Sequence, residues 1–224
     1  MNGYDFSLAG AALAALPAGA LWWPERRLLA VSDLHLGKSE RAARRGGALL
    51  PPYETEDTLA RLDAEIGARR PETVLCLGDS FDDPAAAGAL AETHRLWLAR
   101  LMAGRRRLWI EGNHDPGPLA LGGSHLAEHR EGPLVFRHVA RPGASGEVSG
   151  HYHPKARIGA GLSRPCFLVD AARLILPAFG TFTGGLRCDS PPLAGLMGAG
   201  ALALLIGPRI SALPMPRAGG APGR

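Results

Sequence analysis

The chain has 224 residues and is 46% hydrophobic, so it is long enough for one sizeable α/β core or two small ones at most. Its net charge is +4, and 23 of its 25 basic residues are arginine. Because arginine, alanine, glycine and proline are abundant together, a GC-rich genome explains this charge as well as a nucleic-acid partner does.

The cysteines and the apolar runs indicate where the protein works. Three cysteines lie far apart and have no CxxC spacing, which favours a reducing, intracellular setting. The early stretch LAGAALAALPAGALWW looks like an export signal, but Asp5 precedes it and Pro17 interrupts it, which favours a hairpin. Since no apolar run approaches the ~20 residues of a membrane-spanning helix, we expect a cytoplasmic protein with no membrane partner.

The first half of the sequence alternates between buried strands and helices. We expect strands over 26–33, 73–79 and 106–115, separated by a helix that starts near 53 and by a second helix over 84–103. This alternation predicts a parallel sheet with right-handed crossovers. In such sheets, binding sites form beyond the carboxyl ends of the strands.

The second half consists of short apolar runs that are bounded by turn residues. Segments such as PLVFRHVA, GEVSGHYHP and ALALLIG predict antiparallel strands and hairpins. No repeat and no linker divides the chain, so we expect a single domain over residues 1–213. Residues 214–224 have no apolar pattern, and we expect them to form a disordered tail.

Polar fragments recur at the ends of the predicted strands. They are D-x-H at 33–35, G-D-x-x-D at 78–82, G-N-H-D at 112–115, a histidine at 138 and G-H-x-H at 150–153. Each fragment alone is better explained as a turn or a strand end, but their order at successive strand ends predicts one shared crevice. Oxygen and imidazole donors without thiolate suit Mn²⁺, Fe²⁺ or Zn²⁺. Two ions about 3.5–4 Å apart need the ligands of several converging strand ends.

This set of fragments resembles the calcineurin-like metallophosphoesterase superfamily, from about Asp33 to His153. The resemblance implies an α/β fold, namely a four-layer α/β/β/α sandwich with a two-metal site at the C-terminal ends of strands. It implies two divalent ions, first of all Mn²⁺, with Fe or Zn as alternatives. By motif position, the implied ligands are Asp33, His35 and His153 for the first ion, Asn113, His138 and His151 for the second, and Asp79 as the bridge between them.

The same resemblance implies a proton donor. His114, the histidine of G-N-H-D, resembles the acid that protonates the leaving group in this superfamily, and Asp82 is expected to orient it. Protonation of the departing alkoxide is typically worth about 10²–10⁴-fold in rate. With two metal ions and this acid, the chemistry needs no serine, cysteine or P-loop nucleophile.

A narrower resemblance comes from segments outside the metal fragments. SDLHLGKSERAARRGGALLPPYETEDTLARL, SGHYHPKARI and LPAFGTFTGG together resemble the bacterial ligase-associated DNA damage response endonucleases, a branch of this superfamily. This resemblance covers most of the chain, up to about Gly185. It implies a DNA phosphodiester substrate and a repair setting beside a DNA ligase and a helicase.

A basic segment after D-x-H is the expected contact to DNA. Lys38, Arg41, Arg44 and Arg45 follow that fragment directly, so they should edge the metal site. Positive side chains there can bind backbone phosphates without reading the base sequence, although a solvated basic face would have the same composition. No row of exposed aromatic residues predicts base stacking.

Three functions fit these patterns. The first is a two-metal phosphodiesterase or endonuclease that acts on DNA in repair. The second is a two-metal enzyme for a small substrate, such as a cyclic nucleotide or a phosphomonoester. The third is a metal-bound scaffold that docks repair proteins. The presence of His114 and Asp82 counts against the scaffold, and a basic surface beyond the crevice would separate the first function from the second.

Overall fold

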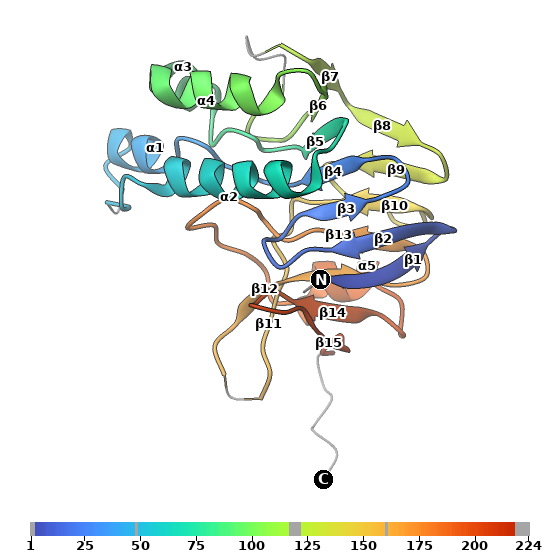
Figure 1. Ribbon diagram of the computed structural model, residues 1–224. Helices are drawn as coiled ribbons and strands as arrows, with labels where there is room; N and C mark the ends of the chain where they lie inside the picture. The colour runs from blue at the N-terminus through green and yellow to red at the C-terminus, as the bar shows by residue number, and fades with distance from the viewer. Residues whose placement is uncertain (1–2, 48, 117–121, 160, 218–224) are drawn as a thin grey trace.

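The computed structural model describes residues 3–47, 49–116, 122–159 and 161–217. Two β-sheets stack face to face, and helices cover the outer face of each sheet (Figure 1). The helices of the N-terminal half lie over the first sheet, and a short helix near the C-terminus lies over the second. The expected four-layer α/β/β/α sandwich is therefore confirmed.

The first sheet has seven strands in sequential order. They are β1 (Tyr4–Leu8), β2 (Ala11–Ala15), β3 (Leu21–Trp23), β4 (Leu28–Val31), β5 (Thr73–Leu77), β6 (Arg106–Ile110) and β7 (Ser124–Leu126). β1 to β4 pair antiparallel, so the early apolar stretch forms hairpins, as predicted. β4 to β7 pair in parallel, which confirms the parallel sheet expected from the strand–helix alternation.

Helices α1 (Lys38–Arg44) and α2 (Glu54–Arg69) connect β4 to β5. The helix expected over 84–103 is two helices, α3 (Pro84–Ala89) and α4 (Glu92–Met102). The helix breaks because Leu90 and Ala91 adopt extended backbone angles, and Gly88 lowers helix stability just before them. The break lets the side chain of Leu90 pack into the core beneath α4. Within the described ranges, no helix is both long enough and apolar enough to cross a membrane.

The second sheet has the strand order β15-β14-β12-β13-β10-β9-β8, and β11 pairs with β12. Its strands are β8 (Glu128–Glu131), β9 (Leu134–Arg137), β10 (Glu147–Ser149), β11 (Lys155–Ala156), β12 (Arg164–Val169), β13 (Arg173–Ile175), β14 (Leu202–Leu205) and β15 (Ser211–Pro214). Most of them pair antiparallel, as predicted, but β10 runs parallel to both β9 and β13. Short buried strands carry no mark of direction, so the sequence pattern missed these parallel pairs.

Three hydrophobic cores fill the spaces between the layers. The core between the two sheets includes Leu75 and Phe136. A second core joins the first sheet to α2 and α4 through residues such as Leu62 and Leu101. The third joins the second sheet to α5 (Pro191–Leu196) through Leu193. Strands of both sheets are thus buried on two faces, which explains their continuous apolar runs.

The ordered part of the chain extends past residue 214, where the sequence pattern predicted that a disordered tail begins. Pro214 is the last residue of β15, and the Met215 side chain is buried in the core beneath α5. Arg217 donates hydrogen bonds to two carbonyl oxygens at the end of α5, at 3.2 and 3.1 Å. Hydrogen bonds and one buried side chain therefore hold residues that the sequence pattern had assigned to a disordered segment. Residues 218–224 of that expected tail lie outside the described residues.

Replacing Phe136 with alanine should lower the free energy of unfolding by about 3–5 kcal/mol, because its ring is fully buried between the sheets. Chemical denaturation followed by circular dichroism measures this loss. Leu162→Ala is the control, since Leu162 lies on the surface and its loss should change stability by less than about 0.5 kcal/mol. Equal effects of the two substitutions would contradict the inter-sheet core.

Candidate metal centre

The candidate site lies where two groups of parallel strands end. β4, β5 and β6 of the first sheet end at nearly the same height, because Val31 pairs with Cys76, and Leu77 pairs with Ile110. β9 and β10 of the second sheet are also parallel to each other. The residues that follow these five strands include all seven predicted metal ligands: Asp33, His35, Asp79, Asn113, His138, His151 and His153.

Backbone hydrogen bonds lock the first two loops together beyond their strands. The amide of Asp33 donates to the carbonyl of Gly78 at 3.2 Å, and the amide of His35 donates to the carbonyl of Asp79 at 3.0 Å. The amide of Asp82 then donates back to the carbonyl of Leu36 at 3.1 Å. D-x-H and G-D-x-x-D therefore continue the parallel pairing of β4 and β5, which fixes the relative positions of their side chains.

Asp33, His35 and His153 form the first cluster, with ligand atoms within 4.8 Å of one another. The Nε2 atom of His153 lies 3.1 Å from Asp33 Oδ1 and 3.4 Å from His35 Nε2. The other carboxylate oxygen of Asp33 accepts hydrogen bonds from the Ser32 hydroxyl and from the His151 amide, the latter at 3.0 Å. Burial raises the pKa of Asp33, but its contacts with His153 outweigh burial and hold the pKa below its usual value.

Asp79, His138 and His151 form the second cluster. The Nε2 atom of His138 lies 3.3 Å from Asp79 Oδ2 and 3.2 Å from His151 Nδ1. Asn113 joins them, because its Oδ1 atom is 3.0 Å from the same His138 nitrogen. Burial opposes the charge of Asp79, yet the contact with His138 and a 2.8 Å hydrogen bond from the amide of His114 bring its pKa to about 2.

The lone pairs around His138 fit a bound cation. Its Nδ1 atom lies 3.0 Å from the carbonyl of Leu77, which can only accept, so Nδ1 carries the proton and Nε2 presents a lone pair. That lone pair faces oxygens of Asp79 and Asn113, which are acceptors as well. Acceptors that converge inside a protein need a positive charge, which either a proton on Nε2 or a metal ion can supply. Burial lowers the pKa of His138, but its contacts with Asp79 and Asp33 outweigh burial and raise the pKa, so the site favours positive charge at this position. The second cluster therefore fits a divalent ion, and the first adjoins it, since Asp33 Oδ1 is 4.0 Å from His138 Nδ1.

The backbone at the predicted ligands is strained. Five of the seven have a left-handed backbone, with φ of 53° at Asp33, 46° at His35, 46° at Asp79, 72° at His151 and 46° at His153. This conformation costs L-residues other than glycine roughly 1–2 kcal/mol each. Such strain persists only where the surrounding structure enforces it, and it concentrates at functional sites.

The glycines of two motifs allow these ligands to approach each other. A Cβ atom at Gly150 would lie 1.7 Å from the Ser32 hydroxyl oxygen and 2.6 Å from Asp33 Oδ2. A Cβ atom at Gly112 would lie 2.1 Å from Asp79 Oδ1. Any larger residue would push the carboxylates out of the clusters, so G-H-x-H and G-N-H-D need their glycines for close approach.

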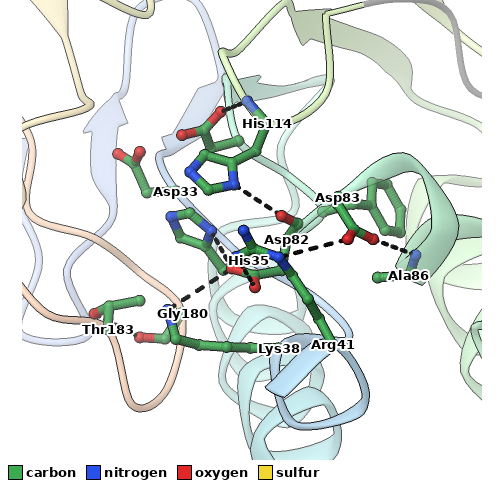
Figure 2. Close-up of polar contacts among 12 residues, drawn as sticks. Asp33, His35, Lys38, Arg41, Asp82, Asp83, Ala86, His114, Gly180 and Thr183 are labelled. Atoms are coloured by element: carbon green, nitrogen blue, oxygen red, sulfur yellow. Dashed lines mark hydrogen bonds and ion pairs between the residues drawn. The ribbon is translucent and has the colours of Figure 1, made fainter. Parts of the chain in front are cut away.

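His114 lies beside the first cluster, where its ring packs edge to face on that of His35 with centroids 5.1 Å apart. Its Nδ1 atom is 2.8 Å from the backbone carbonyl of Asp82 (Figure 2). The carbonyl can only accept, so Nδ1 carries the proton of this contact, and Nε2 is not part of it. The contact between Asp82 and His114 that the sequence suggested thus runs through the Asp82 main chain.

The carboxylate of Asp82 has a different partner. Its Oδ1 atom lies 2.8 Å from Nδ1 of His35, so it holds His35 with the Nε2 atom toward the first cluster (Figure 2). A carboxylate on the far nitrogen of a metal-binding histidine is the usual means of fixing its tautomer and orientation. Burial raises the pKa of Asp82, but hydrogen bonds from His35 and Arg41 outweigh burial and lower the pKa.

The four residues predicted to contact DNA have acidic partners within the protein. The nitrogen–oxygen distances are 3.7 Å for Lys38–Asp82, 2.7 Å for Arg41–Asp82, 2.8 Å for Arg44–Asp83 and 3.6 Å for Arg45–Asp83. Arg41 is the more enclosed of the arginines, with 24% of its side chain exposed, whereas Arg45 keeps 60% exposed. These ion pairs hold α1 against the loop that follows β5, a function that the sequence did not reveal.

Asp115 belongs to one of the predicted motifs, but the sequence pattern predicted no role for it. Asp115, the last residue of G-N-H-D, is buried and accepts hydrogen bonds from the amides of Ser80 at 2.7 Å and Phe81 at 3.2 Å. It also accepts one from Gly112 at 3.2 Å. Burial outweighs these donors and raises its pKa to about 6. Asp115 thus ties the loop after β6 to the loop after β5, and only its place in the motif hinted at this.

Comparisons with known proteins agree with this geometry. The calcineurin-like phosphoesterase model matches residues 26–167, which include every predicted ligand. A crystal structure of nuclease MPE from Pseudomonas putida matches with a TM-score of 0.76 and 32% sequence identity, covering 95% of this chain and 100% of that chain. No curated protein matches the chain. The chain therefore belongs to the calcineurin-like phosphoesterase family, whose members are hydrolases of phosphoesters that use divalent metal ions.

Proposed function

We propose that this protein hydrolyses phosphodiester bonds of DNA with two Mn²⁺ ions, in a repair system that includes a DNA ligase and a helicase. The observation that carries the proposal is the similarity, over 95% of the chain, to a protein described as a nuclease. Oxygen and imidazole donors around both clusters suit Mn²⁺, and Fe²⁺ or Zn²⁺ are the alternatives. The resemblance of the longer sequence segments to ligase-associated endonucleases supports the repair setting.

The two clusters support the metal ligands of this proposal. Asp33, His35 and His153 would hold one ion, Asn113, His138 and His151 would hold the other, and Asp79 would be shared between them. When bound, two such ions would supply hydroxide from water near neutral pH and would offset the charge of the phosphate oxygens. The chain keeps these ligands in place by the paired backbones of D-x-H and G-D-x-x-D and by the carboxylate of Asp82 on His35.

His114 protonates the leaving oxygen in this proposal. Its Nδ1 atom is occupied by the carbonyl of Asp82, so the imidazolium delivers the proton from Nε2. A DNA alkoxide is a poor leaving group and gains most from such an acid, whereas a nitrophenolate leaves without one. A scaffold has no use for a histidine held in this way, which argues against a protein that only docks partners.

The proposal is tested by assaying the Mn²⁺-loaded protein on single-stranded DNA, duplex DNA and bis-p-nitrophenyl phosphate side by side. Cleavage of DNA at a catalytic efficiency well above that for the small diester is expected, because phosphates beyond the scissile one add binding energy. Efficient turnover of small diesters or monoesters without cleavage of DNA would instead support the small-substrate enzyme.

Asp79→Asn should abolish binding of both metal ions and nearly all activity, because a neutral amide cannot bridge two cations. Metal content after dialysis, measured by inductively coupled plasma mass spectrometry, checks this loss. Asp5→Asn is the matched control, since Asp5 is exposed on β1 and should keep both ions. Full metal content in Asp79→Asn would show that this carboxylate is not a shared ligand.

His114→Ala should keep its metal ions but cleave DNA about 10²–10⁴-fold more slowly, because the leaving alkoxide loses its proton donor. Hydrolysis of bis-p-nitrophenyl phosphate should fall far less, and kcat values for the two substrates measure the difference. His94→Ala, on α4, should behave like the unmodified protein. Losses of equal size on both substrates would rule out a leaving-group acid.

Alanine substitutions of Arg45 and Arg41 should distinguish a residue that contacts DNA from one that forms a structural ion pair. Arg45→Ala should raise KM for DNA and reduce the salt dependence of binding by about one counterion, without changing hydrolysis of bis-p-nitrophenyl phosphate. Arg41→Ala should impair both substrates, because it removes the 2.7 Å partner of the buried Asp82 carboxylate that orients His35. Identical profiles for the two variants would contradict this division.

A further inference from the structure

Two exposed aromatic side chains lie against each other on the surface. Tyr53 and Phe182 are 53% and 40% exposed, and their ring centroids are 5.6 Å apart at an interplanar angle of 60°. Among the large hydrophobic side chains that the described part of the molecule exposes, these two are the aromatic ones. The residues are 129 positions apart in the sequence, so the linear pattern showed no aromatic cluster.

The loop that carries Phe182 is bound directly to the candidate metal centre. The amide of Phe179 donates to the carbonyl of Ser32 at 2.8 Å, and the amide of Gly180 donates to the carbonyl of Asp33 at 3.0 Å. Gly180 lies next to the site residues in the close-up (Figure 2). A Cβ atom at Gly185 would lie 2.1 Å from the carbonyl of His153, so the other end of the loop touches that ligand too.

Tyr53 is tied to the same site from the other side. It is the residue before α2, whose first residues bind the segment after D-x-H. The amide of Gly37 donates to the hydroxyl of Thr55 at 3.0 Å, and the hydroxyl of Ser39 donates to the carboxylate of Glu54 at 2.6 Å. The aromatic pair therefore has a fixed position beside the loop of His35.

Phe182 is also held in an unfavourable conformation. Its φ is 58°, in the left-handed region that favours glycine, although glycines are nearby in the same loop. The preceding residue is fixed to α2, because Arg61 donates to the Thr181 hydroxyl at 2.8 Å and the Thr181 amide donates to Thr58 at 3.1 Å. A strained backbone that presents a large apolar ring to solvent points to a binding role for the ring.

We propose that Tyr53 and Phe182 form a stacking platform for one nucleobase of the strand whose phosphodiester lies at the metal centre. This inference rests on the proposed function as a DNA phosphodiesterase. Every base has a π-face, so such a platform holds the strand without reading its sequence. Lys155 donates a hydrogen bond to the carbonyl of Thr183, the residue after Phe182, and so places a positive charge on this loop. Arg61 also binds the loop, but its charge is paired with Asp57 at 3.1 Å. The charge of Lys155 favours a polyanion over an apolar protein segment.

The platform is tested with short DNA strands that have one cleavable phosphodiester and a single abasic residue at successive positions. In the unmodified protein, the abasic residue at one position should raise KM about five-fold to 150-fold, the range expected for loss of one stacked base. Phe182→Ala should raise KM for the intact strand by a similar factor and show no further effect of that abasic residue. Phe182→Tyr should keep the original KM, because it keeps an aromatic ring. Phe182→Leu should show the same raised KM as Phe182→Ala, because leucine retains the apolar bulk without a ring.

Fluorescence gives a second readout that does not depend on turnover. The fluorescence of a strand with 2-aminopurine at the sensitive position should be quenched when the strand binds the unmodified protein, but not when it binds Phe182→Ala. Leu96→Ala removes another exposed apolar side chain, on α4, and should change neither KM nor quenching.

The outcomes separate the platform from the proposed function. DNA cleavage with no sensitive abasic position, or an equal loss by Phe182→Ala on intact and abasic strands, would overturn the platform and leave the phosphodiesterase. Absence of DNA binding and cleavage in the unmodified protein would overturn both. Hydrolysis of bis-p-nitrophenyl phosphate at the original kcat shows that Phe182→Ala retains its metal centre, so folding and stacking effects are distinguished.

Discussion

The structure depends on a concentration of hydrogen-bond acceptors at the ends of five strands. The carboxylate of Asp33 is fully buried, and the Nε2 atoms of His35 and His153 approach each other to 3.4 Å beside it. Around His138, a carboxylate oxygen and an amide oxygen face a nitrogen lone pair. Such groups repel one another unless positive charge lies between them, so a divalent metal ion bound there would stabilise this arrangement.

Asp82 by itself contacts several elements of the site. Its amide pairs with the loop after β4, its carbonyl accepts from His114, and its carboxylate lies against His35 and Arg41. A shift of this residue would therefore move a metal ligand, the candidate acid and α1 together. This coupling explains why the basic helix lies so close to the metal centre and why its arginines have structural partners there.

The rim of the site combines positive charge with aromatic surface. Arg45 keeps most of its side chain exposed, while the pair Tyr53 and Phe182 presents ring faces on the segments that hold the loops of the ligands. In the proposed complex with DNA, this charge would bind the phosphates of a strand and the ring faces would bind its bases. The same anchoring hydrogen bonds that keep the Phe182 loop on Asp33 would keep a bound base at a constant distance from the reacting phosphate.

The sequence pattern alone was sufficient to predict the parallel strands and a shared crevice of polar fragments at their ends, because strand ends and turn glycines are local features. The four-layer sandwich and the seven ligands came from the resemblance of those fragments to a known superfamily. The pattern was insufficient for the direction of β10 and for the break between α3 and α4, since short apolar runs have no direction and helix breaks depend on core packing. The partners of Asp82 and the meeting of Tyr53 with Phe182 were decided only by the tertiary structure. Both are contacts between segments far apart in the chain, and composition or spacing does not record which distant segments the closed fold brings together.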